Sequence, residues 1–139
     1  ARLVTVMMAE LDPAPAWLAG GSVAAIGGWN CIFAVTLRAL RQFVADFAEN
    51  NRGDDEGGSF TLEDARRALH AVVGKSDKEL LPIAGTDPDA EGAHYVVNKV
   101  ALLVAVATHL DLKSVRYCPA TGGCAGLFAL GKFRPLGRV

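Results

Sequence analysis

The stretch Tyr95–Leu110, YVVNKVALLVAVATHL, decides the fold class of this chain because it is apolar at almost every position. The segment Thr86–Glu91 before it (TDPDAE) combines a polar cap, a proline and acidic residues, which are typical of a helix start. Together they predict a long helix that ends near Asp111. Because Asn98 and Lys99 interrupt the apolar run, we expect a buried core helix and no membrane span.

Two more main helices are expected on the N-terminal side of this stretch. One begins at a cap on Ser22 and runs to about Glu49, and its second half repeats apolar residues at helical spacing. These apolar residues are Leu37, Leu40, Val44 and Phe47. The other begins at a capping box of Thr61 and Asp64 and ends at Gly74.

Shorter elements complete the expected fold. Ser76 and Glu79 repeat the capping pattern for a short helix that stops at Pro82, and Leu112–Cys118 alternates like a strand. The opening Arg2–Met8 fits either a strand or a helical turn. We therefore predict a mostly α fold: a single compact domain of three to four main helices with extended terminal segments and short strands as an option at both ends.

Composition favours one globular domain over residues 1–139, since 51% of the residues are hydrophobic and 21% are charged. Residues 50–59 (NNRGDDEGGS) are polar, acidic and rich in glycine, which predicts an exposed acidic loop. Residues 127–139 are apolar and then basic, and we expect them to form a C-terminal tail.

The charge is distributed unevenly, although the formal net charge is only −1. Residues 51–91 carry 5 basic and 10 acidic side chains, whereas residues 92–139 carry 6 basic and 1 acidic. Whole-molecule attraction to nucleic acid is not indicated. One explanation of this pattern is that the charged residues lie on surfaces that face solvent. The other is that they make an electrostatic contact with a second copy or with a phosphate backbone.

The three cysteines, Cys31, Cys118 and Cys124, are an odd number, which argues against a secreted disulfide framework. We therefore expect a reducing, intracellular compartment. No signal peptide is evident in the opening residues.

No motif in the sequence is sufficient for catalysis or metal binding. Glu91 and His94 form one Glu-x-x-His, but a di-metal bundle needs a second copy of that pattern. His109, Cys118 and Cys124 lack a Cys-x-x-Cys pair and a fourth ligand. Ser22 does not lie in a Gly-x-Ser-x-Gly turn. The sequence therefore favours a protein that is not an enzyme and needs no metal or cofactor.

The glycine segment Ala19–Gly28 (AGGSVAAIGG) allows another interpretation. Glycines before a capped helix offer unpaired N–H groups to an anion such as a phosphate or a carboxylate. Gly20, Gly21 and Ser22 are the candidate ligand-binding residues, while close helix packing is the simpler explanation of the same glycines.

The string Pro13-Ala14-Pro15, followed by Gly20–Ala25 (GGSVAA), resembles the opening of the formiminotransferase-cyclodeaminase family, helical enzymes that act on folates. The resemblance covers about 13 residues, with Ala16–Ala19 inserted between its halves. It implies that Gly20, Gly21 and Ser22 line a folate site, and it supports the alternative function of a small helical enzyme or ligand-binding module.

Assembly is the function that we predict first. Apolar helices and terminal segments beyond the needs of a lone domain suggest packing against neighbouring copies as a homo-oligomer or polymer. Five basic residues suit sequence-independent contact with single-stranded nucleic acid, and a solvated helix face is the simpler role for the first two. They are Arg38, Arg41, Lys132, Arg134 and Arg138. The sequence thus predicts a non-enzymatic, self-associating structural protein, in its specific form a helical coat or nucleic-acid-packaging subunit.

Overall fold

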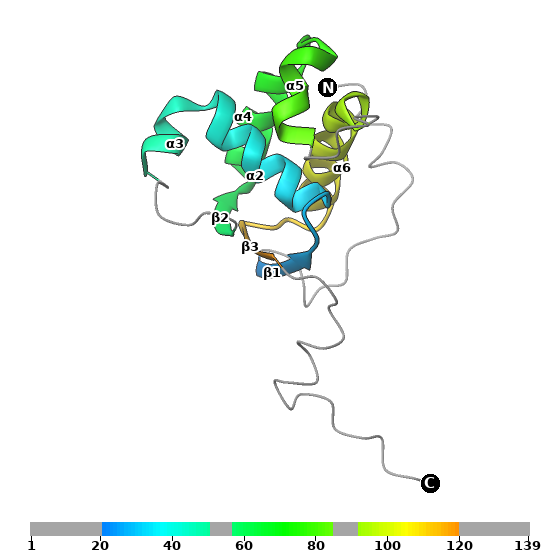
Figure 1. Ribbon diagram of the computed structural model, residues 1–139. Coiled ribbons are helices and arrows are strands. Elements are labelled where there is room, and N and C mark those ends of the chain that lie inside the picture. Colours follow the sequence, from blue (N-terminus) through cyan, green and yellow to red (C-terminus); the bar gives the residue numbers. More distant parts are fainter. Residues whose placement is uncertain (1–20, 51–56, 85–91, 120–139) are drawn as a thin grey trace, which may run out of the picture.

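The computed structural model describes residues 21–50, 57–84 and 92–119. Helices dominate these ranges, and a small three-stranded sheet accompanies them (Figure 1). In chain order the elements are β1 Ser22–Gly27, α2 Ile32–Phe43, α3 Ala45–Asn50, β2 Gly58–Thr61, α4 Leu62–Val72, α5 Asp77–Ala84, the 3-10 turn η1 Ala93–Tyr95, α6 Val96–His109 and β3 Ser114–Pro119. The predicted mostly α class with short strands is confirmed.

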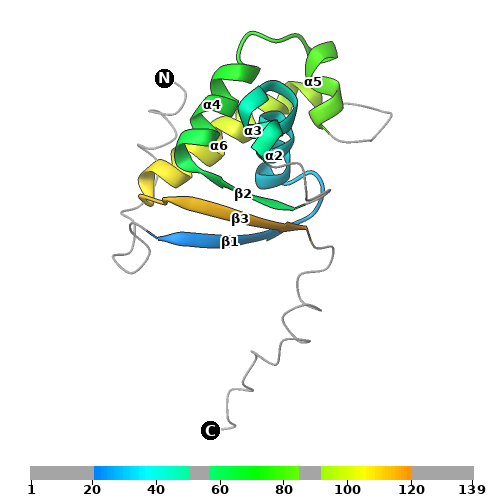
Figure 2. The same ribbon diagram turned by 90° about the vertical axis from the view of Figure 1, so that its left-hand side faces the viewer.

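The sheet joins distant parts of the chain, with β3 between β1 and β2. β1 runs parallel to β3, with Ser22 opposite Ser114, and β2 runs antiparallel to it. Ala25, Val115 and Tyr117 are buried in the core, so one face of the sheet packs against the helices. Figure 2 shows the helices gathered on one side, with β1 at the margin of the sheet farthest from them.

Helices α2, α4 and α6 pack against one another above the sheet. Their largest buried side chains include Leu37, Leu40, Val72, Val100 and Leu103. Burying an aliphatic side chain of this size stabilises the fold by about 1.5–3 kcal/mol, so these contacts dominate the core. All four residues of the predicted apolar spacing, Leu37, Leu40, Val44 and Phe47, are buried, as is most of the apolar stretch in α6.

The predicted capping box starts α4. Asp64 N donates to Thr61 Oγ1 at 3.1 Å, and Thr61 N donates to Asp64 Oδ2 at 3.0 Å. The helix ends at Val72, and Gly74 adopts the left-handed conformation (φ 84°) that favours glycine after a helix. The strand predicted over Leu112–Cys118 is also present, as β3.

The helix predicted to start at Ser22 is wrong, because Ser22–Gly27 is strand β1. Its apolar run fits a strand as well as a helix, and pairing with β3 decides between them by giving the backbone hydrogen-bond partners. α2 begins only at Ile32, and the extended backbone of Val44 (φ −120°, ψ 94°) separates it from α3.

Three other boundaries also differ from the prediction. α6 begins at Val96, after the 3-10 turn η1, and does not continue from the predicted start at Thr86–Glu91. Pro82 does not stop the short helix but lies inside α5, which continues to Ala84. The loop predicted over residues 50–59 is shorter, because Asn50 belongs to α3 and Gly58 and Ser59 belong to β2. Residues 51–56, the segments Arg2–Met8 and Thr86–Glu91 and the tail 127–139 lie outside the described residues.

Across the ranges that the structure describes, no helix is both long enough and apolar enough to cross a membrane.

Candidate functional site

The last residue of β1 and the connection that leads from it to α2, residues Gly27–Cys31 (GGWNC), form the centre of the candidate site, and we call this segment the β1–α2 loop. Four consecutive carbonyls of this loop accept hydrogen bonds from side chains of other elements. The bonds run from Tyr117 Oη to Gly27 O and Gly28 O (3.0 and 3.3 Å), from Arg38 Nη1 to Trp29 O (2.7 Å) and from Lys99 Nζ to Asn30 O (3.0 Å). The loop is therefore held in one conformation by β3, α2 and α6.

The loop ends at the N-terminus of α2. Cys31 is the N-cap, and Ala34 N donates to its Sγ at 3.5 Å. A Cβ on Gly27 would lie 2.8 Å from that sulfur, so only glycine leaves room for the thiol in this arrangement. A strand, a glycine pair and a helix start thus follow one another here, which is an arrangement that favours anions near the helix N-terminus.

Arg38 extends from α2 back along the loop. Its Nε donates to Ile83 O at 3.0 Å, and its guanidinium carbon lies 4.4 Å from the centre of the Trp29 ring. The side chain is half-buried, and this burial lowers the pKa of the guanidinium. Nη2 is buried without a hydrogen-bond partner in the described part of the chain. Arg38 therefore brings a poorly solvated positive charge to the loop.

Lys99 brings a second positive charge from α6, donating to Asn30 Oδ1 at 2.7 Å as well as to the backbone. Partial burial lowers the pKa of its ammonium group, and the nearby charge of Arg38 lowers it further. Within residues 21–50, 57–84 and 92–119, neither cation forms a salt bridge with a carboxylate. Two neighbouring positive charges of this kind attract an anion.

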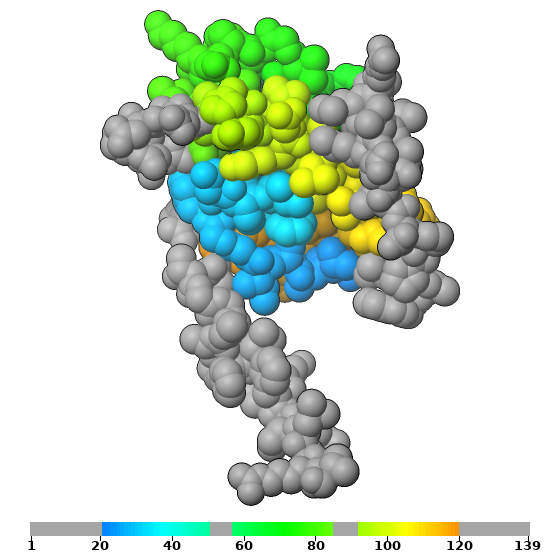
Figure 3. Space-filling view, turned by 90° about the vertical axis from the view of Figure 1, so that its right-hand side faces the viewer, coloured from blue at the N-terminus to red at the C-terminus, as the bar shows by residue number. Residues whose placement is uncertain are grey.

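Exposed aromatic rings accompany these cations. Trp29 is 44% exposed and Tyr95 is 52% exposed. Tyr95 lies four residues before Lys99, so the two share one side of the same helical segment. Figure 3 shows the blue surface of the β1–α2 segment bordering the lime and yellow surface of α6. We call Trp29, Arg38, Tyr95 and Lys99 the Trp29 patch.

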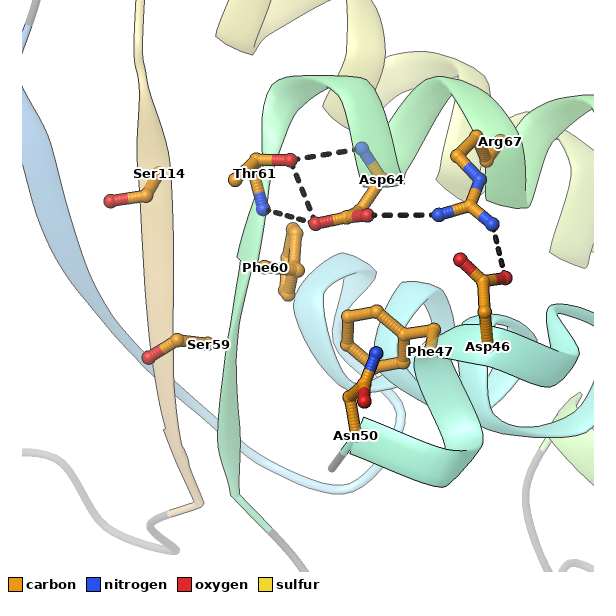
Figure 4. Close-up of a pocket in the computed structure, with 9 residues that line it drawn as sticks. All are labelled: Asp46, Phe47, Asn50, Ser59, Phe60, Thr61, Asp64, Arg67 and Ser114. Atoms are coloured by element: carbon orange, nitrogen blue, oxygen red, sulfur yellow. Dashed lines mark hydrogen bonds and ion pairs between the residues drawn. The ribbon is translucent and has the colours of Figure 1, made fainter. Parts of the chain in front are cut away.

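A second group of polar residues lines a shallow pocket of about 280 Å³ between α3, β2 and α4 (Figure 4). Arg67 bridges two carboxylates there, with Asp46 on α3 and Asp64 on α4 (3.5 Å to Asp64). The hydrogen bond from Arg67 lowers the pKa of Asp46 and raises that of Arg67 itself. Since these charges satisfy one another, the cluster fastens α3 to α4, and it is a weaker candidate for ligand binding than the Trp29 patch.

The predicted nucleic-acid residues are placed unequally. Arg38 belongs to the Trp29 patch, whereas Arg41 Nη2 donates to Gly57 O at 2.7 Å, at the start of the β2 segment. Both arginines are half-buried, so the expected solvated helix face is wrong for them. Lys132, Arg134 and Arg138 lie outside the described residues.

The predicted ligand residues lose the helix start that suggested them. Ser22 is in β1 and accepts a hydrogen bond from Ser114 Oγ at 2.7 Å, and Gly21 O accepts one from Lys113 N. Gly20 lies outside the described residues. The second glycine pair of the same segment, Gly27 and Gly28, is the one that precedes a helix.

The weak metal-binding patterns gain no support from the described residues. No group of three or more His, Cys, Asp or Glu side chains is placed to hold a metal ion where the structure describes the chain. Glu91 and Cys124 lie outside that part.

Sequence reasoning missed Trp29, Asn30, Lys99 and Tyr117 as site residues. Lys99 and Asn30 are 69 residues apart and Tyr117 and Gly27 are 90 apart, so no local pattern links them. The glycine pair immediately before a tryptophan and a helix was the signal available for the loop itself.

No protein family model, no curated protein and no solved structure matches this chain.

Proposed function

We propose that this chain is a non-enzymatic, self-associating structural protein that binds single-stranded nucleic acid through the Trp29 patch. One observation carries the binding part of the proposal. Arg38 lies over the exposed ring of Trp29, Lys99 donates to the neighbouring Asn30, and neither cation has a carboxylate partner among the described residues.

The patch suits a single strand because it offers both kinds of contact that such a strand uses. Exposed rings such as Trp29 and Tyr95 stack on unpaired bases without regard to sequence, and the cations attract the phosphates between them. The carbonyls that accept hydrogen bonds from Arg38 and Lys99 orient the two side chains without neutralising their charge. A duplex hides its bases, so it can use only the cations.

The C-terminal residues Lys132, Arg134 and Arg138 remain part of the proposal as additional phosphate contacts. A coat or packaging subunit of this kind works as a homo-oligomer or polymer, in which many weak patches act on one strand. The proposed compartment is intracellular and reducing, and the free thiols of Cys31 and Cys118 support it.

The test is a titration of the chain with an unlabelled oligothymidylate. Binding is monitored through the fluorescence of Trp29 in a Trp17→Phe background. Lys99→Gln removes one charge from the patch. Arg66→Gln removes one charge from the exposed face of α4 and is the matched control. We expect quenching on binding, and a salt dependence that Lys99→Gln reduces by about 0.7 in log–log slope for one lost phosphate contact.

Loss of affinity in both variants alike would show general electrostatic attraction and no defined patch. If neither variant changes the affinity, Lys99 does not take part in the proposed binding. Trp29→Ala lacks the fluorescent reporter, so its binding is measured by the anisotropy of a labelled strand. This variant separates stacking from charge, because base–aromatic stacking contributes about 1–3 kcal/mol per base.

A small ligand-binding module is the second candidate, since Gly27 and Gly28 lead from a strand directly into the N-terminus of α2. A single phosphate-bearing or carboxylate ligand, such as a folate, fits that arrangement without a polymer. The two functions differ in how the affinity depends on the length of the nucleic acid. A module binds a mononucleotide as tightly as a long strand, whereas a packaging surface binds the long strand more tightly.

A further inference from the structure

The outer edge of β1 has no partner strand in the described part of the chain, because the sheet order is β1-β3-β2. An edge strand presents a row of N–H and C=O groups that another strand can pair with, and proteins usually protect such edges with charges, proline or bulges. β1 (Ser22–Gly27, SVAAIG) carries none of these devices. Its register with β3 continues residue by residue from Ser22 to Gly27, without a bulge.

The other edge strand is different. β2 has only four residues, and Arg41 donates to the carbonyl of Gly57 just before it. The last residue of β2, Thr61, is already the N-cap of α4. β1 is therefore the longer and less protected edge, and Figures 1 and 2 place it at the margin of the molecule away from the helices.

The side chains of β1 alternate in exposure. Ser22, Ala24 and Ile26 are exposed on the outer face, and Ile26 is 54% exposed, whereas Ala25 is buried. A strand added to this edge must continue the same alternation. Opposite residues of two antiparallel strands point to the same face, so in a pair of β1 strands outer residues oppose outer residues.

We propose that β1 pairs antiparallel with β1 of a second copy about a two-fold axis, with Ala24 opposite its own symmetry mate. This inference deepens the self-association proposed above and rests on it. Ser22 then lies opposite Ile26 of the partner subunit, and the two sheets form one continuous sheet of six strands. Because the axis is perpendicular to the sheet, the helices of both copies stay on the same side.

A second copy is the occupant that β1 fits, because a two-fold contact must be complementary to itself. The strand is uncharged from Ser22 to Gly27, so its pairing with a copy brings no like charges together. The Trp29 patch is left outside the ladder, so assembly and strand binding use different residues.

The test uses Ala24→Lys and Ala24→Glu in the full chain, with mass measured by light scattering. We expect the unsubstituted chain to form dimers or larger species, and each variant alone to dissociate at least tenfold more readily, because like charges face each other across the axis. Mixing the two variants should restore the heterodimer. Ala45→Lys, which puts the same charge on an exposed position of α3, should leave the mass unchanged.

Restoration by mixing distinguishes a broken interface from a misfolded chain, and circular dichroism of each variant checks folding. If Ala24→Lys does not fold, Ala24→Cys in a background without Cys31, Cys118 and Cys124 replaces it. An interchain disulfide then supports the proposal, and its absence from an assembled sample contradicts it.

Three results overturn the inference. If Ala24→Lys assembles as the unsubstituted chain does, the interface lies elsewhere, and the proposed self-association still stands. A chain that dimerises only after deletion of residues 1–20 shows that its own N-terminal segment occupies the edge. A monomer at every concentration refutes both this interface and the proposed self-association, and leaves strand binding by the Trp29 patch to its own assay.

Discussion

Gly27 shows how strongly the candidate site depends on a single residue. A Cβ at this position would lie 2.8 Å from Cys31 Sγ and 3.0 Å from Cys31 Cβ, whereas a Cβ on Gly28 would meet nothing within 4 Å. We expect Gly27→Ala to lower the free energy of unfolding by about 1–3 kcal/mol, the usual cost of overpacking, and to weaken oligothymidylate binding. Urea unfolding and the fluorescence titration measure the two effects.

Gly28→Ala is the matched control, because it adds the same methyl group one residue later in the same loop. It should be nearly neutral in both assays. If the two variants are destabilised equally, the cause is the lost conformational freedom of the glycine backbone, and the space around the Cys31 thiol does not determine the stability of the loop.

Glu79 gives a pH-dependent contribution that can be predicted in sign. Hydrogen bonds from the backbone N–H and the hydroxyl of Ser76 lower the pKa of its carboxyl group, and the nearby charge of Lys75 adds to the shift. A carboxyl whose pKa is lower in the folded state stabilises the fold above its unfolded pKa of about 4.3, and this contribution is lost as the pH falls through the folded value.

We therefore expect Glu79→Gln to have a lower Tm than the unsubstituted chain at neutral pH and to approach it in acid. Thermal melts across the acidic range measure this difference, with Glu49→Gln as the control for losing one exposed carboxylate. A difference that stays constant down to strongly acidic pH would show that the charge of Glu79 contributes nothing.

At the residue scale, the sequence predicted the local contacts and missed the distant ones. Thr61 with Asp64 and Ser76 with Glu79 are three residues apart, and both pairs form the hydrogen bonds that the pattern indicates. The bond from Lys99 to Asn30 spans 69 residues, and only the packing of α6 beside the β1–α2 loop creates it.

At the element scale, the limit of prediction is clearest in Ser22–Gly27. Its apolar residues satisfy a helical period and a strand alternation equally, and β1 is decided by a partner strand 92 residues away. α6 was predictable because its apolar stretch is long, and α4 because both of its ends carry signals. A helix start does follow the glycine segment, but it lies at Ile32, one strand later than predicted.

Pro82 provides a test at the same scale. It is the sixth of eight residues in α5, and it has no N–H to donate to the carbonyl of Lys78 four residues before it. We expect Pro82→Ala to restore this bond and to raise the free energy of unfolding by about 1–3 kcal/mol. Urea unfolding measures the change, and Lys78→Ala, which adds an alanine to the same helix without a new backbone bond, is the control. A neutral or destabilising Pro82→Ala would show that α5 already accommodates the proline without loss.

At the scale of the whole molecule, the first and last elements of the described chain pair with each other. β1 is the first of these elements and β3 is the last. α2, α4 and α6, which lie between the two strands in the sequence, pack against one another. The β1–α2 loop is held by Arg38 of α2, Lys99 of α6 and Tyr117 of β3, so it exists only when all three elements are in place. Folding and formation of the candidate site are therefore one process.

This dependence predicts a single cooperative unfolding transition, as expected for one domain. In the Trp17→Phe background, Trp29 fluorescence reports the loop, and far-UV circular dichroism reports the helices. We expect both signals to change at the same urea concentration with the same slope, because loss of α6 or β3 removes the groups that hold the loop. If the fluorescence changes at a lower urea concentration than the helical signal, the loop opens while the helical core persists, and the hydrogen bonds of Tyr117 and Lys99 do not couple the site to the fold.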